Sequence, residues 1–144
     1  MKNKFIRENN KSYYVIKRVD KSIIPKEVEI RCDLRNLTPS NGGGTIKLYR
    51  NNFCNPSFLE FSYKNDVLKI EEFYSFETRV GHGRFLLESL LEIIAFHNDY
   101  EAVFRPILTV KGKIKPKGIT YEEALIIYDK CGFLKGNELY REIK

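Results

Sequence analysis

The spacing of apolar residues predicts that the first half of the chain consists of strands and loops. Three segments alternate apolar with polar residues or are rich in β-branched and aromatic ones, as strands are: Tyr13 to Val19, Glu27 to Leu34 and Thr45 to Arg50. Two intervening segments, Asn36 to Gly44 with its three successive glycines and Asn51 to Pro56, are predicted as loops. We therefore expect a strand-rich N-terminal half.

A β-hairpin is predicted next, followed by two later strands. Phe58 to Tyr63 and Val67 to Tyr74 flank the short polar turn Lys64-Asn65-Asp66, which is the arrangement expected for two antiparallel strands. Ala102 to Val110 and Glu138 to Ile143 have the composition of two further strands.

Two helices are predicted in the second half. After Gly83 the apolar residues follow a helical period, with a wide apolar face opposite a narrow polar strip. A second helix begins after Thr120, because Thr120-Tyr121-Glu122-Glu123 matches a capping box, and it ends at Gly132, the residue type preferred just past a helix end. Strands and helices together predict a single α/β domain.

The bulk composition fits one cytoplasmic domain. The chain has 144 residues, of which 42% are hydrophobic, and this is enough for one sizeable core. No apolar run approaches the length of a membrane span, and Met1 to Asn10 is charged and polar rather than apolar like a secretion signal. We expect a cytoplasmic protein with no membrane partner.

The cysteines and histidines indicate neither a disulfide framework nor a metal site. Cys32, Cys54 and Cys131 are an odd number at long spacings, and only His82 and His97 are available as imidazole ligands. The 25 basic against 19 acidic residues leave a net charge of +6, which favours anionic partners without selecting one. A nucleotide cofactor, an acidic protein and RNA all stay open.

The turn Arg79-Val80-Gly81-His82-Gly83-Arg84, between a predicted strand and a predicted helix, is a candidate anion site. A strand that runs into Gly-x-Gly at a helix start presents several backbone N–H groups toward one point, where the helix dipole adds about half a positive charge. Glycine lets the main chain approach a phosphate closely. Arg79 and Arg84 could add side-chain contacts, whereas no chemistry is assigned to the His82 ring.

Other phosphate-binding motifs fit this turn poorly. A dinucleotide-binding fold requires a third glycine where Leu86 stands, and a P-loop requires Gly-Lys-Ser/Thr, which the sequence lacks. A strand-to-helix turn that binds nothing is the remaining alternative. The pattern of strand, loop, Gly-x-Gly-x-x-Leu and long apolar helix resembles the coenzyme A loop of the GNAT superfamily of N-acetyltransferases.

A second motif downstream strengthens this resemblance. The segment Ala124 to Phe133 is similar to the family's helix with Ala-x-x-x-Tyr followed by x-x-x-Gly-Phe, so the resemblance covers roughly Val67 to Lys144. It implies a GNAT-type fold, with a mixed, mostly antiparallel central sheet and flanking helices. It also implies an acyl-CoA-dependent acyltransferase that moves an acetyl group from acetyl-CoA to an amine. The strand-rich first half departs from the family, in which two helices shape the acceptor pocket.

The resemblance further implies roles for single residues. Tyr128 corresponds to the tyrosine that protonates the departing coenzyme A thiolate, while a core tyrosine on the same stripe as Ala124 and Ile127 is the alternative. The main chain of Phe73 and Tyr74 is expected to pair with the pantetheine arm. The pyrophosphate is expected to bind to Arg79, Val80, Gly81, His82, Gly83 and Arg84.

The acceptor side is less defined. An amine with a pKa of about 10.4 must lose a proton, to a carboxylate or an ordered water, before it attacks a thioester. Strict strand alternation points Glu71 and Glu72 to opposite faces, so at most one of them can face the acceptor, and both could equally be exposed strand charges. The acceptor, whether a small molecule, a protein or an aminoacyl group, stays undefined.

A run of lysines lies beside the expected active-site mouth. It could meet the 3'-phosphate of the cofactor, an acidic protein or RNA, although a solvated loop is the simpler interpretation. The alternative to an enzyme is therefore a non-catalytic GNAT-like module that binds a protein or nucleic acid through its basic surface. The run consists of Lys111, Lys113, Lys115 and Lys117.

Overall fold

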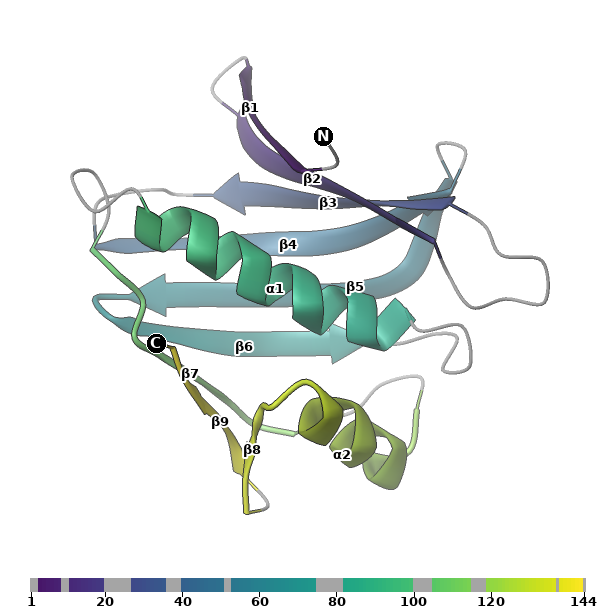
Figure 1. The fold of residues 1–144 in the computed structure, drawn as a ribbon, viewed down its shortest axis with the longest axis vertical. Coiled ribbons are helices and arrows are strands. Elements are labelled where there is room, and N and C mark those ends of the chain that lie inside the picture. Colours follow the sequence, from purple (N-terminus) through teal and green to yellow (C-terminus); the bar gives the residue numbers. More distant parts are fainter. Residues whose placement is uncertain are drawn as a thin grey trace.

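The computed structural model describes residues 3–8, 11–19, 27–35, 40–50, 53–74, 82–99, 105–114, 119–136 and 138–143. These residues form nine strands and two helices (Figure 1). The elements are β1 (Asn3–Glu8), β2 (Lys11–Val19), β3 (Glu27–Arg35), β4 (Asn41–Arg50), β5 (Phe53–Lys64), β6 (Val67–Tyr74), α1 (His82–Asp99), β7 (Thr109–Gly112), α2 (Tyr121–Lys130), β8 (Leu134–Lys135) and β9 (Glu138–Glu142).

All of these strands belong to one sheet, in the order β1-β2-β3-β4-β5-β6-β7-β9-β8. Each neighbouring pair is antiparallel except β6 and β7, which run parallel. Two consecutive strands can be parallel only if a crossover connects them, and α1 is that crossover. The predicted mixed α/β class with a strand-rich first half is confirmed.

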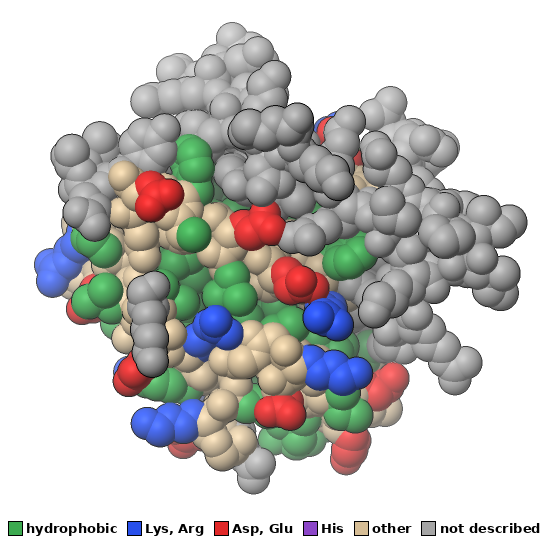
Figure 2. All heavy atoms as spheres, viewed as in Figure 1, with side chains coloured by type: hydrophobic (Ala, Val, Ile, Leu, Met, Phe, Trp, Pro, Cys, Tyr) green, Lys and Arg blue, Asp and Glu red, His purple; other side chains and the backbone are tan. Residues whose placement is uncertain are grey.

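The core lies on one face of the sheet. Ile30 of β3 is paired with Leu48 of β4, and Ile46 of β4 with Leu59 of β5, so their side chains share the face that α1 covers (Figure 1). We call this the inner face and the opposite one the outer face. From the helix side, charged side chains of both signs are scattered among apolar ones (Figure 2). The helix residues that complete the core include Leu86, Leu87, Leu90 and Ile94.

Two of the predicted loops are partly strand. β4 already begins at Asn41, and Phe53 to Pro56 belong to β5, so both loop predictions were wrong over these residues. The glycines of β4 serve packing rather than a turn. A Cβ on Gly44 would lie 2.8 Å from Cζ of the Phe61 ring and 2.9 Å from the carbonyl oxygen of Asp33. Only glycine leaves room for that ring against the strand.

The strand predicted from Ala102 to Val110 was largely wrong. β7 begins at Thr109, and residues 105–108 have no regular structure, while 102–104 lie outside the described residues. The side chain of Asn98 takes the place of a neighbouring strand, because its Nδ2 donates to the Ile107 carbonyl at 2.9 Å and its Oδ1 accepts from the Ile107 N–H at 2.8 Å. The end of α1 is thereby tied to the entry of β7.

The hairpin and both helices were predicted correctly. β5 and β6 pair across the turn, where Asn65 has a φ of 58°. α2 starts at the capping box of Thr120 and Glu123, and Gly132 follows its end with a φ of 76°. The strand β1 was not predicted, and none of the described helices is long and apolar enough to cross a membrane.

We predict that Gly44→Ala lowers the free energy of unfolding by about 1–3 kcal/mol, because the added methyl group overpacks against Phe61 and the backbone of β3. Thr45→Val is the matched control on the same strand, since Thr45 is only partly buried and lies on the outer face. Urea unfolding of the three proteins measures the difference. Equal stability of Gly44→Ala and the parent would contradict the packing role.

Candidate functional site

The parallel pairing of β6 with β7 ends before β6 does. Their pairing runs from Val67↔Thr109 to Ile70↔Gly112, while β6 continues to Tyr74. β7 ends at Gly112, opposite Ile70, and α2 lies near the part of β6 that continues past this point (Figure 1). Among the described residues, the end of β6 therefore has a neighbouring strand, β5, on one side only.

A β-bulge in β6 follows directly after its last pair with β7. Phe61 of β5 is paired with Ile70, and Glu60 with Glu72, so Glu71 is an extra residue in β6. The Glu71 carboxylate accepts a hydrogen bond from Ser62 Oγ at 2.7 Å, which places it on the outer face. Glu72 lies opposite Glu60 and shares that face. The prediction that the two glutamates point to opposite faces was wrong, because the bulge interrupts the alternation.

Past the bulge, Phe73 points inward and meets Tyr128 of α2. Phe73 is 3% exposed and Tyr128 is 2% exposed, and their ring centroids are 5.2 Å apart. Burial raises the pKa of Tyr128 well above its ordinary value of 10.0, so the phenol is protonated at neutral pH. Tyr74 turns to the outer face, where its ring stacks on that of Phe58 at 5.9 Å.

The C-terminal end of α2 is held by a set of backbone and side-chain hydrogen bonds. The N–H of Gly132 donates to the Asp129 carbonyl, and the N–H of Phe133 donates to the Tyr128 carbonyl, which together form a Schellman motif. Arg141 Nη1 then donates to the Cys131 carbonyl at 2.7 Å, at the negative end of the helix dipole. These bonds fix the last turn of α2 and hence the position of Tyr128.

Cys131 is an unreactive thiol. The pKa of Cys131 is raised to about 11, mainly by burial and secondarily by the nearby Glu88 carboxylate. The thiolate is the nucleophilic form of cysteine, and it is scarce at neutral pH when the pKa is that high. Cys131 therefore does not act as a nucleophile here.

The predicted phosphate turn is described only in part. Arg79, Val80 and Gly81 lie outside the described residues. His82 is the first residue of α1 and Gly83 the second, so the helix starts within the turn, slightly earlier than the sequence predicted. The Nε of Arg84 lies 3.0 Å from Oε1 of Glu88 one helical turn later.

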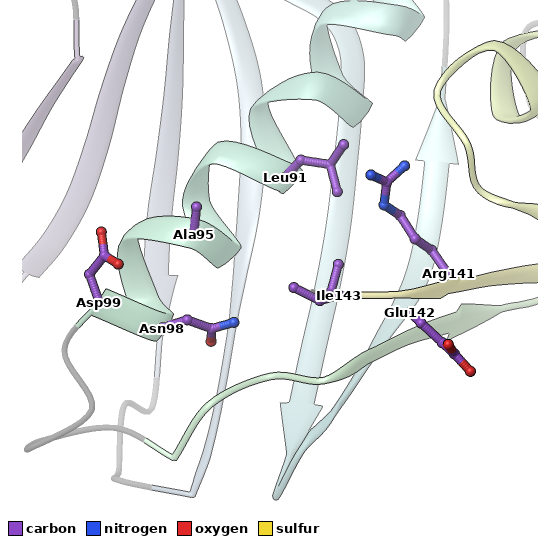
Figure 3. A pocket seen from close by; sticks show the side chains of 7 residues that line it. All are labelled: Leu91, Ala95, Asn98, Asp99, Arg141, Glu142 and Ile143. Carbon is purple, nitrogen blue, oxygen red and sulfur yellow. The ribbon is translucent and has the colours of Figure 1, made fainter.

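Two hollows lie in the C-terminal part of the sheet. One of about 580 Å³ lies between the second half of α1 and β9, with Leu91, Ala95 and Ile143 on its walls and Arg141 reaching toward it (Figure 3). The other, of about 630 Å³, lies at the end of β7 and is lined by three lysines and two tyrosines. The second hollow contains Lys111 and Lys113 of the predicted lysine run, whereas Lys115 and Lys117 lie outside the described residues.

The structure brings some of the predicted residues together and keeps others apart. Phe73 and Tyr128 are in contact on the inner face, whereas Glu71, Glu72 and Tyr74 lie on the outer face at the same end of β6. Arg141, which fixes the end of α2, was not predicted, because its role depends on pairing between β7 and β9 rather than on a local pattern. Only the Gly132-Phe133 motif indicated that the segment after α2 matters.

Comparison of the chain with models of known families, with curated proteins and with solved structures found no match. Within the described residues, no group of three or more histidine, cysteine, aspartate or glutamate side chains could hold a metal ion.

His97 is a buried histidine at the other end of α1. Its Nε2 lies 3.0 Å from the Arg105 carbonyl oxygen, and its ring meets the Tyr63 ring edge-on with centroids 4.9 Å apart. Burial lowers the pKa of His97 below its ordinary value of 6.5, although the hydrogen bond to Arg105 opposes the shift. The imidazole is therefore neutral in the folded protein at pH values where the unfolded chain begins to take up a proton.

We predict that this difference makes the protein less stable in mild acid. Below pH 6.5 the unfolded state binds more protons than the folded state. The free energy of unfolding therefore decreases as the pH is lowered, until folded His97 also protonates. The loss from this one group is at most about 1.4 kcal/mol per pH unit. Urea unfolding from pH 7.5 to 5.5 measures it, and His97→Gln should show a shallower slope. An identical slope in both proteins would remove His97 as the cause.

Proposed function

We propose that this chain is a cytoplasmic N-acetyltransferase of the GNAT type, which transfers an acetyl group from acetyl-CoA to an amine by direct attack within a ternary complex. One observation carries the proposal: β6 continues past the end of its parallel neighbour β7 to Phe73 and Tyr74, and Tyr128 lies against Phe73 there. The resemblance requires a gap beside β6 there, because the pantetheine arm of the cofactor fills it.

The order of the elements supports the same proposal. From β6 onward the chain runs strand, helix, strand, helix and strand, which is the order that the resemblance implies. Both motifs occupy the expected places: the Gly-x-Gly turn opens α1, and the Ala-x-x-x-Tyr motif lies on α2. The two motifs were recognised from sequence alone, so the strand geometry between them is a separate line of support.

The backbone of β6 provides the means to hold the cofactor. Extended ligands add to a sheet as a further strand when a strand edge offers its N–H and C=O groups. The pantetheine arm contains amides, and the main chain of Phe73 and Tyr74, beyond the last pair with β7, is placed to meet them. At the N-terminus of α1, the first backbone N–H groups and the helix dipole would attract the pyrophosphate.

Tyr128 is the group that would protonate the departing thiolate. Its raised pKa makes the phenol a weak acid, but a thiolate released beside Phe73 would also be desolvated, and burial raises the pKa of a thiol as well. Because both pKa values are raised, proton transfer from the phenol to the thiolate is closer to balance than it would be if only the pKa of Tyr128 were raised. General acid catalysis of this kind contributes about 10²- to 10⁴-fold to a rate.

The outer face would take the acceptor. α1, α2 and Tyr128 lie on the inner face, so donor and acceptor would approach the end of β6 from opposite sides. Glu71 and Glu72 both lie on the outer face, and either carboxylate could receive the proton of the attacking amine directly or through water. Glu71 also accepts a hydrogen bond from Ser62.

A second candidate function is a non-catalytic binding module with the same fold. The lysine-lined hollow at the end of β7 favours it, because a basic surface suits an anionic partner. The two candidates differ in what Tyr128 does: the enzyme needs its hydroxyl, whereas the binding module needs only its ring in the core.

We predict that the protein binds coenzyme A in calorimetry and acetylates amines in a screen with labelled acetyl-CoA. Tyr128→Phe keeps the ring against Phe73 and removes only the hydroxyl. We expect kcat to fall by about 10²- to 10⁴-fold while the affinity for coenzyme A changes little.

Tyr63→Phe is the matched control, since it removes the hydroxyl of another buried tyrosine, which lies beside His97 and away from the end of β6. Two results would contradict the proposal. One is the absence of coenzyme A binding at millimolar concentration. The other is an unchanged kcat in Tyr128→Phe when chemistry is shown to be the slow step.

A further inference from the structure

The hollow at the end of β7 concentrates positive charge in one place. Lys111 and Lys113 come from β7 and the residue after it, and Lys135 comes from β8, so the strand order brings together lysines that are distant in sequence. Glu138 is the one carboxylate among the side chains that line the hollow, which leaves an excess of two positive charges. The lysine run of the sequence is therefore part of a built feature.

Tyr140 lies at the centre of this cluster. It is paired with Lys111 across β7 and β9, and the Nζ of Lys111 lies 6.0 Å from the centroid of its ring. The Nζ of Lys135, from the strand on the other side of β9, lies 5.0 Å from the same centroid. The negative face of an aromatic ring attracts ammonium groups, so the ring offsets part of the repulsion between the two lysines. Both ammonium groups lie closer to the ring centroid than about 8 Å, the screening length at physiological salt, so their fields add there.

Phosphate is the anion that best fits this arrangement. Lysine presents a compact point charge rather than the planar fork with which arginine binds a carboxylate, and it commonly binds phosphate in this way. The charge of a phosphate group can be shared among several ammonium groups at once. A hollow of about 630 Å³ has room for a phosphate together with part of the molecule that carries it.

The hollow borders the acceptor side of the proposed active site. Val110 of β7 is buried on the inner face, so its neighbour Lys111 points outward, the side on which Glu71 lies. Lys69 of β6 is paired with Lys111, and Lys69 Nζ lies 3.8 Å from Glu71 Oε2. The lysine cluster and the candidate base are thus on one face of the sheet, on neighbouring strands.

We propose that the lysine hollow binds a phosphate group of the amine acceptor. The substrate class is then a phosphate-bearing amine, such as a nucleotide or an amine carried by RNA. The naming of the acceptor rests on the proposed acetyltransferase function, while the phosphate site itself rests only on the hollow. Lys111, Lys113 and Lys135 hold the phosphate, and Tyr140 positions two of these lysines.

The test compares two triple variants that remove the same charge. One changes the hollow, with Lys111→Gln, Lys113→Gln and Lys135→Gln. The other changes lysines outside it, with Lys47→Gln, Lys64→Gln and Lys130→Gln. Pyrophosphate binding is followed by calorimetry, and binding of a single-stranded RNA oligonucleotide by fluorescence anisotropy between about 50 and 200 mM salt. Coenzyme A binding is measured in parallel for both variants and the parent.

We expect the hollow variant to bind its phosphate ligand at least about tenfold more weakly than the parent, and the control variant to stay within about twofold. If RNA carries the phosphate, the negative slope of log affinity against log salt should become shallower by about two for three lost contacts. If the acceptor is a small molecule, only pyrophosphate binding should fall. Pyrophosphate bound at the start of α1 would not respond to the lysine change.

Several results would overturn the proposal. Equal weakening in both variants would mean that net charge alone matters, and no weakening in either would mean that the lysines are only solvated. Tighter binding of an acidic peptide than of RNA would make the partner a protein. Loss of coenzyme A affinity in the hollow variant alone would assign the lysines to the cofactor. Failure of the parent to bind coenzyme A would instead count against the acetyltransferase function and leave the phosphate site to be decided by pyrophosphate.

Discussion

The short parallel pairing of β6 with β7 is the constraint on which the rest of the site depends. Four pairs, from Val67↔Thr109 to Ile70↔Gly112, hold the two strands together, and the bulge at Glu71 follows at once. A bulge increases the local twist of a strand, so it changes the direction of β6 beyond this pairing. Gly112 allows a close approach at the last pair, because a Cβ there would lie 3.0 Å from the Ile70 carbonyl oxygen. β7 is thus tightly joined to β6 over its whole length, and β6 continues beyond it.

This geometry divides the proposed chemistry between the two faces of the sheet. On the inner face, α1 and α2 pack on the core, and the Schellman motif with Arg141 holds the end of the helix that carries Tyr128. On the outer face, the same bulge aligns Glu71 with Glu72, and the parallel register places Lys69 beside Lys111. The bulge in β6 therefore accounts for the position of both candidate bases on the outer face, and the parallel register accounts for their proximity to the lysine hollow.

Features with local causes were predicted well from the sequence, whereas features with distant causes were not. The capping box of Thr120 and the glycine at position 132 set the ends of α2 through contacts within a few residues. Gly44 appeared to belong to a loop because its strand role comes from the Phe61 ring on β5. The bulge at Glu71 depends on register with β5, and the meeting of Lys135 with Lys111 depends on the insertion of β9 between β7 and β8. None of these is visible in a local pattern of apolar and polar residues.

Hydrogen exchange of the β6 backbone reports on cofactor binding beside Phe73, because this binding would involve main-chain groups rather than side chains. Amide exchange is measured residue by residue with and without saturating coenzyme A. We expect added coenzyme A to slow exchange at Phe73 or Tyr74, beyond the last pair with β7, and to leave exchange at the paired residue Leu68 nearly unchanged. Binding of coenzyme A with no added protection at Phe73 or Tyr74 would contradict this expectation, because the cofactor would then lie elsewhere on the protein.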